Sequence, residues 1–190
     1  MPNWCNNFIQ IRHKDPAMIE RVLKGKDGLF MEFFPTPEPL TETVVGYPGE
    51  DKQAAQAAQQ AANLEQFGYK DWYDWNVANW GTKWDIELGG IERMDDNSIS
   101  AFFDSAWSPP IGAYAQLVEM GFDIDAMYYE PGMAFCGRWI NGLDDFWNLS
   151  DMTAETVSSL IDSDVDEQFA ISENMAQWEE EARADEESNQ

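Results

Sequence analysis

The stretch Trp72–Asp85, WYDWNVANWGTKWD, changes its hydrophobic period at a single glycine. Before Gly81, tryptophan and asparagine recur three or four residues apart, which predicts one face of a helix. After Gly81, residues 82–88 alternate as TKWDIEL, which predicts a strand. Glycine is favoured where a helix ends in a left-handed residue. The stretch therefore predicts a helix that stops at a glycine corner and continues into a strand.

Alternating segments and helix patterns flank this stretch on both sides. Asp15 followed by Pro16 predicts a helix start, because aspartate caps a helix and proline suits its first position. The predicted elements, in chain order, are a strand at 4–12, a helix from 16, strands at 82–88 and 98–107, a helix from 109 to 121, and strands at 122–130 and 133–140. This order is the split βαβ arrangement of an α+β, ferredoxin-like antiparallel sheet with an extra C-terminal strand.

The same patterns divide the chain into one domain and one appendage. We expect residues 1–150 to form the ferredoxin-like domain, with a helical insertion at 35–80, and residues 151–190 to form an acidic helical appendage. The insertion contains an alanine- and glutamine-rich helix at 51–66. We expect the whole insertion to lie over the domain. Right-handed crossovers place both sheet helices on one face, so the insertion and the C-terminal helices are expected to cover the other.

The chain is strongly acidic throughout. It carries 36 acidic and 11 basic residues, a net charge of −25. Residues 151–190 contribute −12 from 13 acids and one base, and the remaining 23 acids and 10 bases contribute −13. Such a field repels phosphate backbones and anionic membrane surfaces, and it favours basic partners. We therefore expect a protein partner with a basic surface, and no direct binding to nucleic acid or to a membrane.

Two features indicate the cytoplasm. The opening residues, MPNWCNN, lack the charged and apolar regions of a signal peptide, and no stretch approaches the ~20 apolar residues of a membrane span. Cys5 and Cys136 lie outside any CxxC motif, which favours two buried free thiols in a reducing compartment.

Catalytic motifs are sparse. His13 is the only histidine, and the chain has no Walker loop, GxGxxG or GxSxG motif. A carboxylate-based or metal-dependent hydrolase is one alternative, because Asp85 and Asp104 would be neighbours across two strands with Glu130 nearby. Such a pair needs burial to separate its pKa values. We assign no catalytic residue.

The C-terminal segment contains a calcium-like pattern. Four acids in DSDVDEQFAISE have the spacing of the first, third, fifth and twelfth calcium-loop positions: Asp162, Asp164, Asp166 and Glu173. The loop requires glycine at its sixth position, where this chain has Glu167. The competing interpretation is a capping box of Asp164 and Glu167 that opens one helix to about Ala184. We favour the cap, with calcium as the only cofactor considered.

A tryptophan-rich cleft between insertion and sheet is a second candidate site. Buried indoles with convergent polar groups suit a flat ligand or a peptide anchor. The candidate residues are Trp72, Trp75, Asn76, Asn79, Trp80, Lys83, Trp107, Tyr128 and Arg138. Core packing explains the same residues without a ligand, and both interpretations stay open here.

Four short motifs occur in order along residues 1–140: MPNWCNN, NWGTKWD, AWSPP and YYEPGMAFCG. They resemble the YubB-like ferredoxin-like domain family of phage and plasmid proteins, several of which are grouped with Api-type phage proteins. The resemblance implies the fold and a mobile-element origin, and it assigns no activity to individual residues. Our lead hypothesis is a non-enzymatic acidic protein that acts on a host defence or nucleic-acid-processing protein by mimicking nucleic-acid charge. The alternative is a small-ligand-binding protein that uses the tryptophan cleft.

Overall fold

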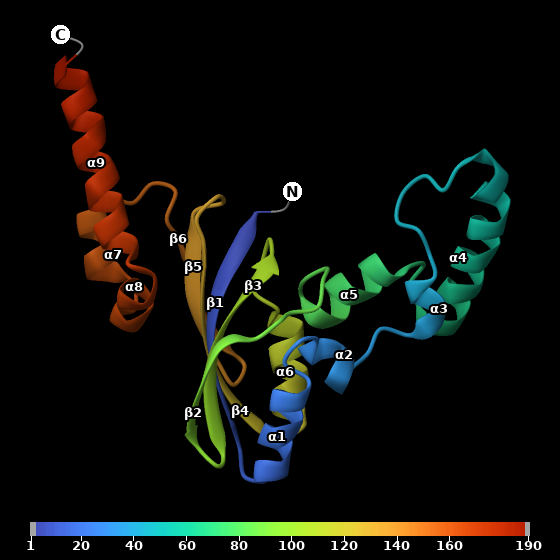
Figure 1. Ribbon diagram of the computed structural model, residues 1–190. Helices are drawn as coiled ribbons and strands as arrows, with labels where there is room; N and C mark the ends of the chain where they lie inside the picture. Colours follow the sequence, from blue (N-terminus) through green and yellow to red (C-terminus); the bar gives the residue numbers. More distant parts are fainter. Residues whose placement is uncertain (1–2, 189–190) are drawn as a thin grey trace.

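The computed structural model, which describes residues 3–188, is built on one six-stranded antiparallel sheet (Figure 1). Its strand order is β2-β3-β1-β4-β5-β6, so β1 lies between β3 and β4 as the ferredoxin-like prediction requires. The strands are β1 (Trp4–His13), β2 (Gly89–Asp95), β3 (Ser98–Ala106), β4 (Phe122–Glu130), β5 (Phe135–Ile140) and β6 (Leu143–Asn148). The predicted α+β fold class is therefore confirmed, with two strands beyond β4 where the sequence predicted one.

The predicted strand at 82–88 is wrong. Residues 82–88 run without sheet pairing, and β2 begins only at Gly89. Ile86 and Leu88 are buried in the core, while Asp85 accepts backbone hydrogen bonds from Phe30 at 2.8 Å and Met31 at 2.9 Å. Residues 82–88 therefore form an extended segment that buries one side without pairing in the sheet. Burial of every second side chain produces the same alternating pattern as a strand with one buried face.

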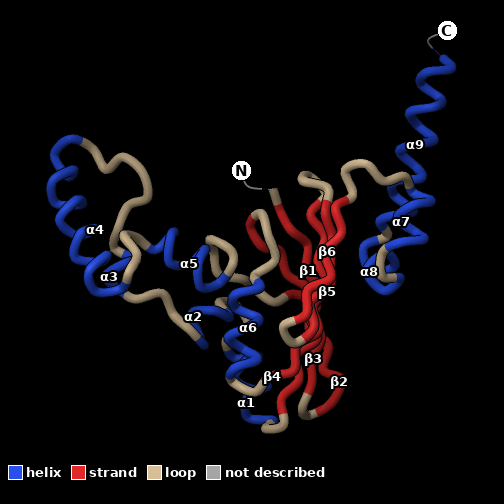
Figure 2. Tube along the Cα trace, turned by 180° about the vertical axis from the view of Figure 1, so that it is seen from behind, coloured by secondary structure: helices blue, strands red, loops and turns tan. Residues whose placement is uncertain are grey.

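Four helices and their connections cover the first face of the sheet: α1 (Pro16–Lys24), α2 (Leu29–Phe33), α5 (Trp72–Trp80) and α6 (Ile111–Glu119) (Figure 2). The main core lies between them and the inward side chains of β1, β3 and β4. Asp15 caps α1 by accepting from Ala17 N at 2.9 Å, as predicted. Gly81 ends α5 in the left-handed region at φ 86°, also as predicted.

Only the last helix of the insertion, α5, packs on the sheet domain, and it does so on the first face. The insertion contains α3 (Glu38–Thr41), a 3₁₀ turn η1 (Glu50–Lys52), α4 (Gln53–Phe67) and α5, and α4 projects away from the sheet as an arm (Figure 1). Asn63 is the one buried residue of α4. Alanine and glutamine form a helix by propensity, but alanine side chains bury too little apolar area to hold it against the domain. The prediction that this insertion covers the second face is wrong.

The C-terminal helices cover part of the second face (Figures 1 and 2). They are α7 (Ala154–Leu160), α8 (Ser163–Phe169) and α9 (Ile171–Ser188). A second apolar cluster joins them to β4, β5 and the residue after β6: Met127, Cys136, Leu149, Val157, Ile161, Val165 and Ile171. This cover reaches β4 and β5 and leaves part of the face over β1 and β3 open.

The predicted single C-terminal helix is two helices. Ala170 adopts φ 50° and separates α8 from α9, and Asp162, not Asp164, caps α8. Asp162 Oδ1 accepts from Asp164 N at 2.8 Å and from Val165 N at 3.3 Å. The break at Ala170 lets both Val165 and Ile171 enter the second cluster, which a straight helix with the Asp164 cap does not provide.

Candidate binding surface

The open part of the second face is an aromatic groove, defined by Trp4, Trp84, Phe102 and Phe169. It has a volume of about 660 Å³ and lies between β1, β3, the segment before β2 and the end of α8. Trp4, Trp84 and Phe102 are 46%, 41% and 45% exposed. Large aromatic side chains that gather at the surface, rather than singly, mark an interaction site.

Sheet register and one capping aspartate position these rings. Phe8 lies directly opposite Phe102 on the neighbouring strand, with ring centroids 5.0 Å apart. Trp84 is not on a strand, and the hydrogen bonds of the adjacent Asp85 to α2 hold it so that its ring lies 5.9 Å from that of Trp4. Cross-strand and ring contacts of this kind fix the orientation of aromatic side chains. The groove is therefore preformed.

Acidic side chains line the aromatic groove. Glu87 and Asp104 are exposed and Asp85 is partly exposed. Asp104 Oδ1 accepts a hydrogen bond from Asn6 Nδ2 at 2.8 Å, which orients the Asp104 carboxylate beside the rings. A surface that combines aromatic faces with carboxylates attracts side chains that carry a positive charge on an apolar stem.

One lysine of the protein already uses this mode of contact. Lys83 Nζ lies 3.7 Å from the ring centroid of Trp84 and 4.1 Å from that of Trp107. Both distances are within the ~6 Å at which an ammonium is attracted to an aromatic face. The tryptophans beside the groove therefore present faces that hold an ammonium group.

The predicted tryptophan cleft is only partly assembled. Four of its nine residues, Trp72, Asn76, Trp80 and Lys83, line a hollow of about 280 Å³ beside Trp84. Asn76 is buried, and both ends of its side-chain amide already have hydrogen-bond partners within the protein. Its Oδ1 accepts from Thr36 Oγ1 at 2.6 Å, and its Nδ2 donates to Lys83 O at 2.9 Å. Small-molecule sites usually measure about 300–1,000 Å³, so this hollow is small for a ligand.

The other five predicted residues lie elsewhere. Trp75 packs on the core with its ring 5.8 Å from that of Trp80, and Asn79 O accepts from Gln116 on α6. Trp107 is exposed on the far side of Lys83. Tyr128 is buried under β5 and β6, where burial raises the pKa of its hydroxyl and its O–H donates to Asp144 at 2.7 Å.

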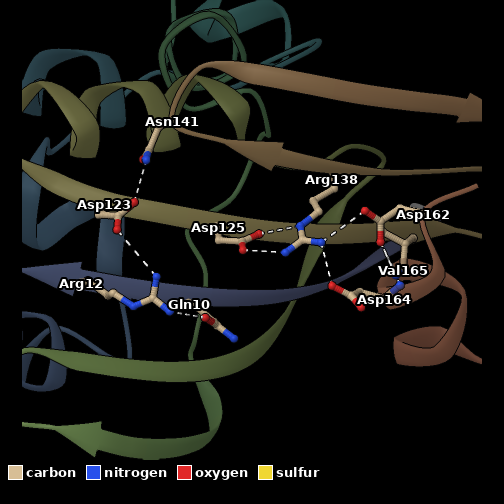
Figure 3. Close-up of polar contacts among 9 residues, drawn as sticks. All are labelled: Gln10, Arg12, Asp123, Asp125, Arg138, Asn141, Asp162, Asp164 and Val165. Carbon is tan, nitrogen blue, oxygen red and sulfur yellow. Dashed lines mark hydrogen bonds and ion pairs between the residues drawn. The ribbon is translucent and has the colours of Figure 1, made fainter.

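Arg138 joins the sheet to the C-terminal helices (Figure 3). From β5 it donates two hydrogen bonds to Asp125 on β4, at 2.9 and 2.8 Å. Its Nη1 also donates to Asp162 at 3.2 Å and to Asp164 at 2.9 Å. The hydrogen bonds to Asp125 are the main cause of a pKa of Arg138 above its ordinary value. Arg138 is thus a structural clamp on the second face and does not reach the tryptophan hollow.

Three of the four acids with calcium-loop spacing make hydrogen bonds or ion pairs within the protein in the same region. Asp162 and Asp164 bind Arg138, and Asp166 accepts from Ser172 N at 2.7 Å and Ser172 Oγ at 2.6 Å. Residues 163–169 are helical, whereas a calcium loop needs a sharp turn at its sixth position. Within residues 3–185, no three His, Cys, Asp or Glu side chains are arranged to hold a metal ion. The segment is a helix start capped by Asp162, and the predicted Asp164–Glu167 capping box is wrong.

Asp85 and Asp104 both line the aromatic groove, and each carboxylate considered for hydrolysis is held by hydrogen bonds to other groups. Asp85 caps α2, Asp104 binds Asn6, and buried Glu130 accepts from the backbone of Gly132 and Met133 at the β4–β5 turn. Acid–base chemistry by two carboxylates requires two such groups in one site with separated pKa values. Each of these three carboxylates therefore has a local structural role.

The two cysteines are free and buried, as predicted. Burial raises the pKa of the Cys5 thiol, and burial with the charge of Asp166 raises the pKa of Cys136 to about 12. His13 is also buried, with its ring 4.8 Å from that of Phe122, and its Nδ1 accepts from Asp15 N at 3.0 Å. Reactive thiols need a lowered pKa and access to solvent, so burial of both cysteines disfavours a nucleophilic role.

Comparison with known proteins yields one structural similarity. No protein-family model and no curated protein sequence matches the chain. The fold is similar to the crystal structure of protein api92 from Yersinia pseudotuberculosis, of the family model DUF1281, with 13% identity and a TM-score of 0.43 over 79% of this chain and 99% of that one. At these values the similarity carries no argument about function. Its name agrees with the Api-type resemblance of the sequence motifs, and the YubB-like grouping stays a prediction.

None of the helices in the described part of the chain is long and apolar enough to cross a bilayer.

Proposed function

We propose that this protein is a non-catalytic binding protein that holds a basic segment of another protein in the aromatic groove. The observation that carries the proposal is the set of exposed rings of Trp4, Trp84 and Phe102 beside the carboxylates of Glu87 and Asp104. A lysine or arginine has an apolar stem for the rings and a charge for the carboxylates. Aromatic residues that bury on binding are also the usual source of affinity at protein interfaces.

The charge of the chain supports a basic partner. With −25 on 190 residues, the field attracts a positive surface over a Debye length and speeds its encounter with the groove. The sequence motifs resemble phage and plasmid proteins, so we propose that the partner is a host-cell protein in the cytoplasm. A defence or nucleic-acid-processing enzyme has the basic surface that such an acidic chain would occupy in place of nucleic acid.

The test begins with capture from bacterial lysate at low salt, followed by calorimetry with the purified partner. The double variant Trp84→Ala with Phe102→Ala removes two rings of the groove and is expected to weaken binding at least tenfold, since interface aromatics often contribute more than ~1.4 kcal/mol. Trp178→Ala is the matched control, because Trp178 is an exposed tryptophan on α9 and does not line the groove.

The electrostatic contribution to partner binding is measured separately, by the salt dependence of the affinity. Raising the salt from about 50 mM to about 500 mM shortens the Debye length from roughly 14 Å to roughly 4 Å and is expected to weaken the complex further. If the captured partner also binds DNA, the protein should compete with DNA for it. Equal affinity of the double variant and the Trp178→Ala control would refute the groove as the binding site.

A further inference from the structure

The two edges of the sheet differ in regularity. β2 pairs with β3 through two register shifts, and Gly90 within it has φ 55°. β6 pairs with β5 in unbroken register over all six residues, from Phe135↔Asn148 to Ile140↔Leu143. Irregular edges resist the addition of another strand, whereas a regular edge is a template for one. β6 is therefore the edge that is open to strand addition.

The outer side of β6 is unoccupied by backbone in the part of the chain that the structure describes. β5 is the only strand that pairs with β6, and residues 143–148 make no other backbone–backbone hydrogen bond among residues 3–188. Leu143 is 76% exposed and Phe146 is 55% exposed, and Trp147 is the one residue of β6 that is partly buried. β6 thus offers both its backbone groups and two apolar side chains to solvent.

The charges of β6 determine which kind of strand can pair with its free edge. Asp144 and Asp145 are exposed at the centre of the strand and point to opposite faces of the sheet, because side chains alternate along a strand. In a two-fold symmetric antiparallel pair of β6 strands centred on Asp144 or on Asp145, that aspartate would lie directly opposite its own copy, because paired residues point to the same face. Like charges directly opposite each other destabilise a strand pair, so the edge disfavours a second copy of this chain.

We propose that β6 accepts an antiparallel strand of a basic partner protein, with two consecutive basic residues flanked by apolar residues. The apolar residues would lie opposite Leu143 and Phe146, and the basic residues opposite Asp144 and Asp145. Main-chain hydrogen bonds supply affinity in this mode of recognition and side chains on alternate faces supply specificity. The inference shares with the proposed function only the basic chemistry of the partner, since β6 does not line the aromatic groove.

The probe is the capped peptide Ser-Val-Lys-Arg-Val-Ser, with affinity measured by fluorescence anisotropy of a labelled form. A second peptide, N-methylated at both basic residues, keeps the charge and loses two backbone donors. We expect the N-methylated peptide to bind at least tenfold more weakly, and the unmodified peptide to slow amide hydrogen exchange within residues 143–148. Equal affinity for the two peptides would overturn the proposal, because binding would then be due to charge alone.

Charge reversal on the two edges provides the matched control. Asp145→Lys is expected to weaken peptide binding about tenfold, and the Asp145 side chain has no hydrogen bond or ion pair within the described residues. Because the substitution also places a lysine opposite Arg138 on β5, a thermal melt of the variant checks that the sheet is intact. Glu92→Lys makes the same kind of charge reversal on β2 and should change affinity about twofold at most. Equal weakening by the two variants would contradict strand addition at β6.

The groove variant separates this inference from the proposed function. Trp84→Ala with Phe102→Ala is expected to leave the affinity for the peptide within about twofold, because distant sites act nearly independently. Loss of peptide binding in that variant would assign the peptide to the aromatic groove and would overturn the assignment to β6.

Discussion

Arg138→Ala tests whether the C-terminal helices depend on a charged clamp. The guanidinium donates four hydrogen bonds of 2.8–3.2 Å to three carboxylates, one from β4 and two from the start of α8. Its removal leaves Asp125, Asp162 and Asp164 close together without their cation. Because Asp162 also caps α8, the repulsion acts on the helix that borders the groove.

The expected loss in the free energy of unfolding of Arg138→Ala lies between the values for breaking a buried and an exposed ion pair. Breaking a buried pair costs about 3–5 kcal/mol, whereas an exposed pair contributes about 0–1 kcal/mol. The side chains of Arg138 and Asp125 are 20% and 19% exposed, but Asp164 is 63% exposed, so solvent screens part of the effect. We therefore expect a loss of about 2 kcal/mol in the free energy of unfolding, or roughly 4–8 °C in melting temperature for a chain of this size.

Thermal melts of Arg138→Ala and Arg12→Ala measure this difference. Arg12 is the matched control, because it lies on the same face of the sheet and pairs with Asp123 at 3.7 Å with both side chains about half exposed (Figure 3). Arg12→Ala should lower the melting temperature by only about 1–2 °C. High salt should narrow the gap by screening the three carboxylates. Equal melting temperatures of the two variants would refute the clamp.

Three further predictions concern packing, backbone and thiols. Gly112→Ala places a Cβ 2.5 Å from Asn79 O, so α5 and α6 must separate, and denaturant unfolding should show a loss of about 2–3 kcal/mol despite the better helix propensity of alanine. Ala170→Gly relieves a left-handed residue at φ 50° and should gain about 0.5–1 kcal/mol; a loss would contradict the strain. Burial raises the pKa of Cys136, so in the native protein at pH 8 it should be alkylated at least about 100-fold more slowly than a free cysteine, because its thiolate fraction is smaller; rapid alkylation would refute its burial.

Strand prediction succeeded where one side of a segment is buried in the sheet. The alternation of β1, β3 and β4 matches their inward side chains, such as Ile9, Ile99 and Ile124. It failed at 82–88, where an extended segment buries alternate residues without pairing. It also missed β6, because LDDFWN is exposed at nearly every position and burial therefore leaves no pattern in its sequence.

The aromatic groove could be anticipated only in part. The alternation of β1 and β3 places Trp4, Phe8 and Phe102 on the face opposite the sheet helices, and the sequence predicts that this face needs cover. Whether this face is covered depends on where the insertion and the C-terminal helices pack in the tertiary structure. Neither Trp84, which reaches the groove from outside the sheet, nor Phe169, which reaches it from α8, is recognisable from the sequence as part of the site.

The sequence by itself determined the local structure and the charge: the caps at Asp15 and Gly81, the order of the first strands and helices, and a surface suited to basic partners. Only the tertiary structure decided which surface stays open. Local periodicity reports that a side chain is buried, but not which distant segment buries it. The Arg138 clamp and the apolar contacts of Val165 and Ile171 fix the C-terminal helices over β4 and β5, and the rings over β1 and β3 stay exposed as a consequence.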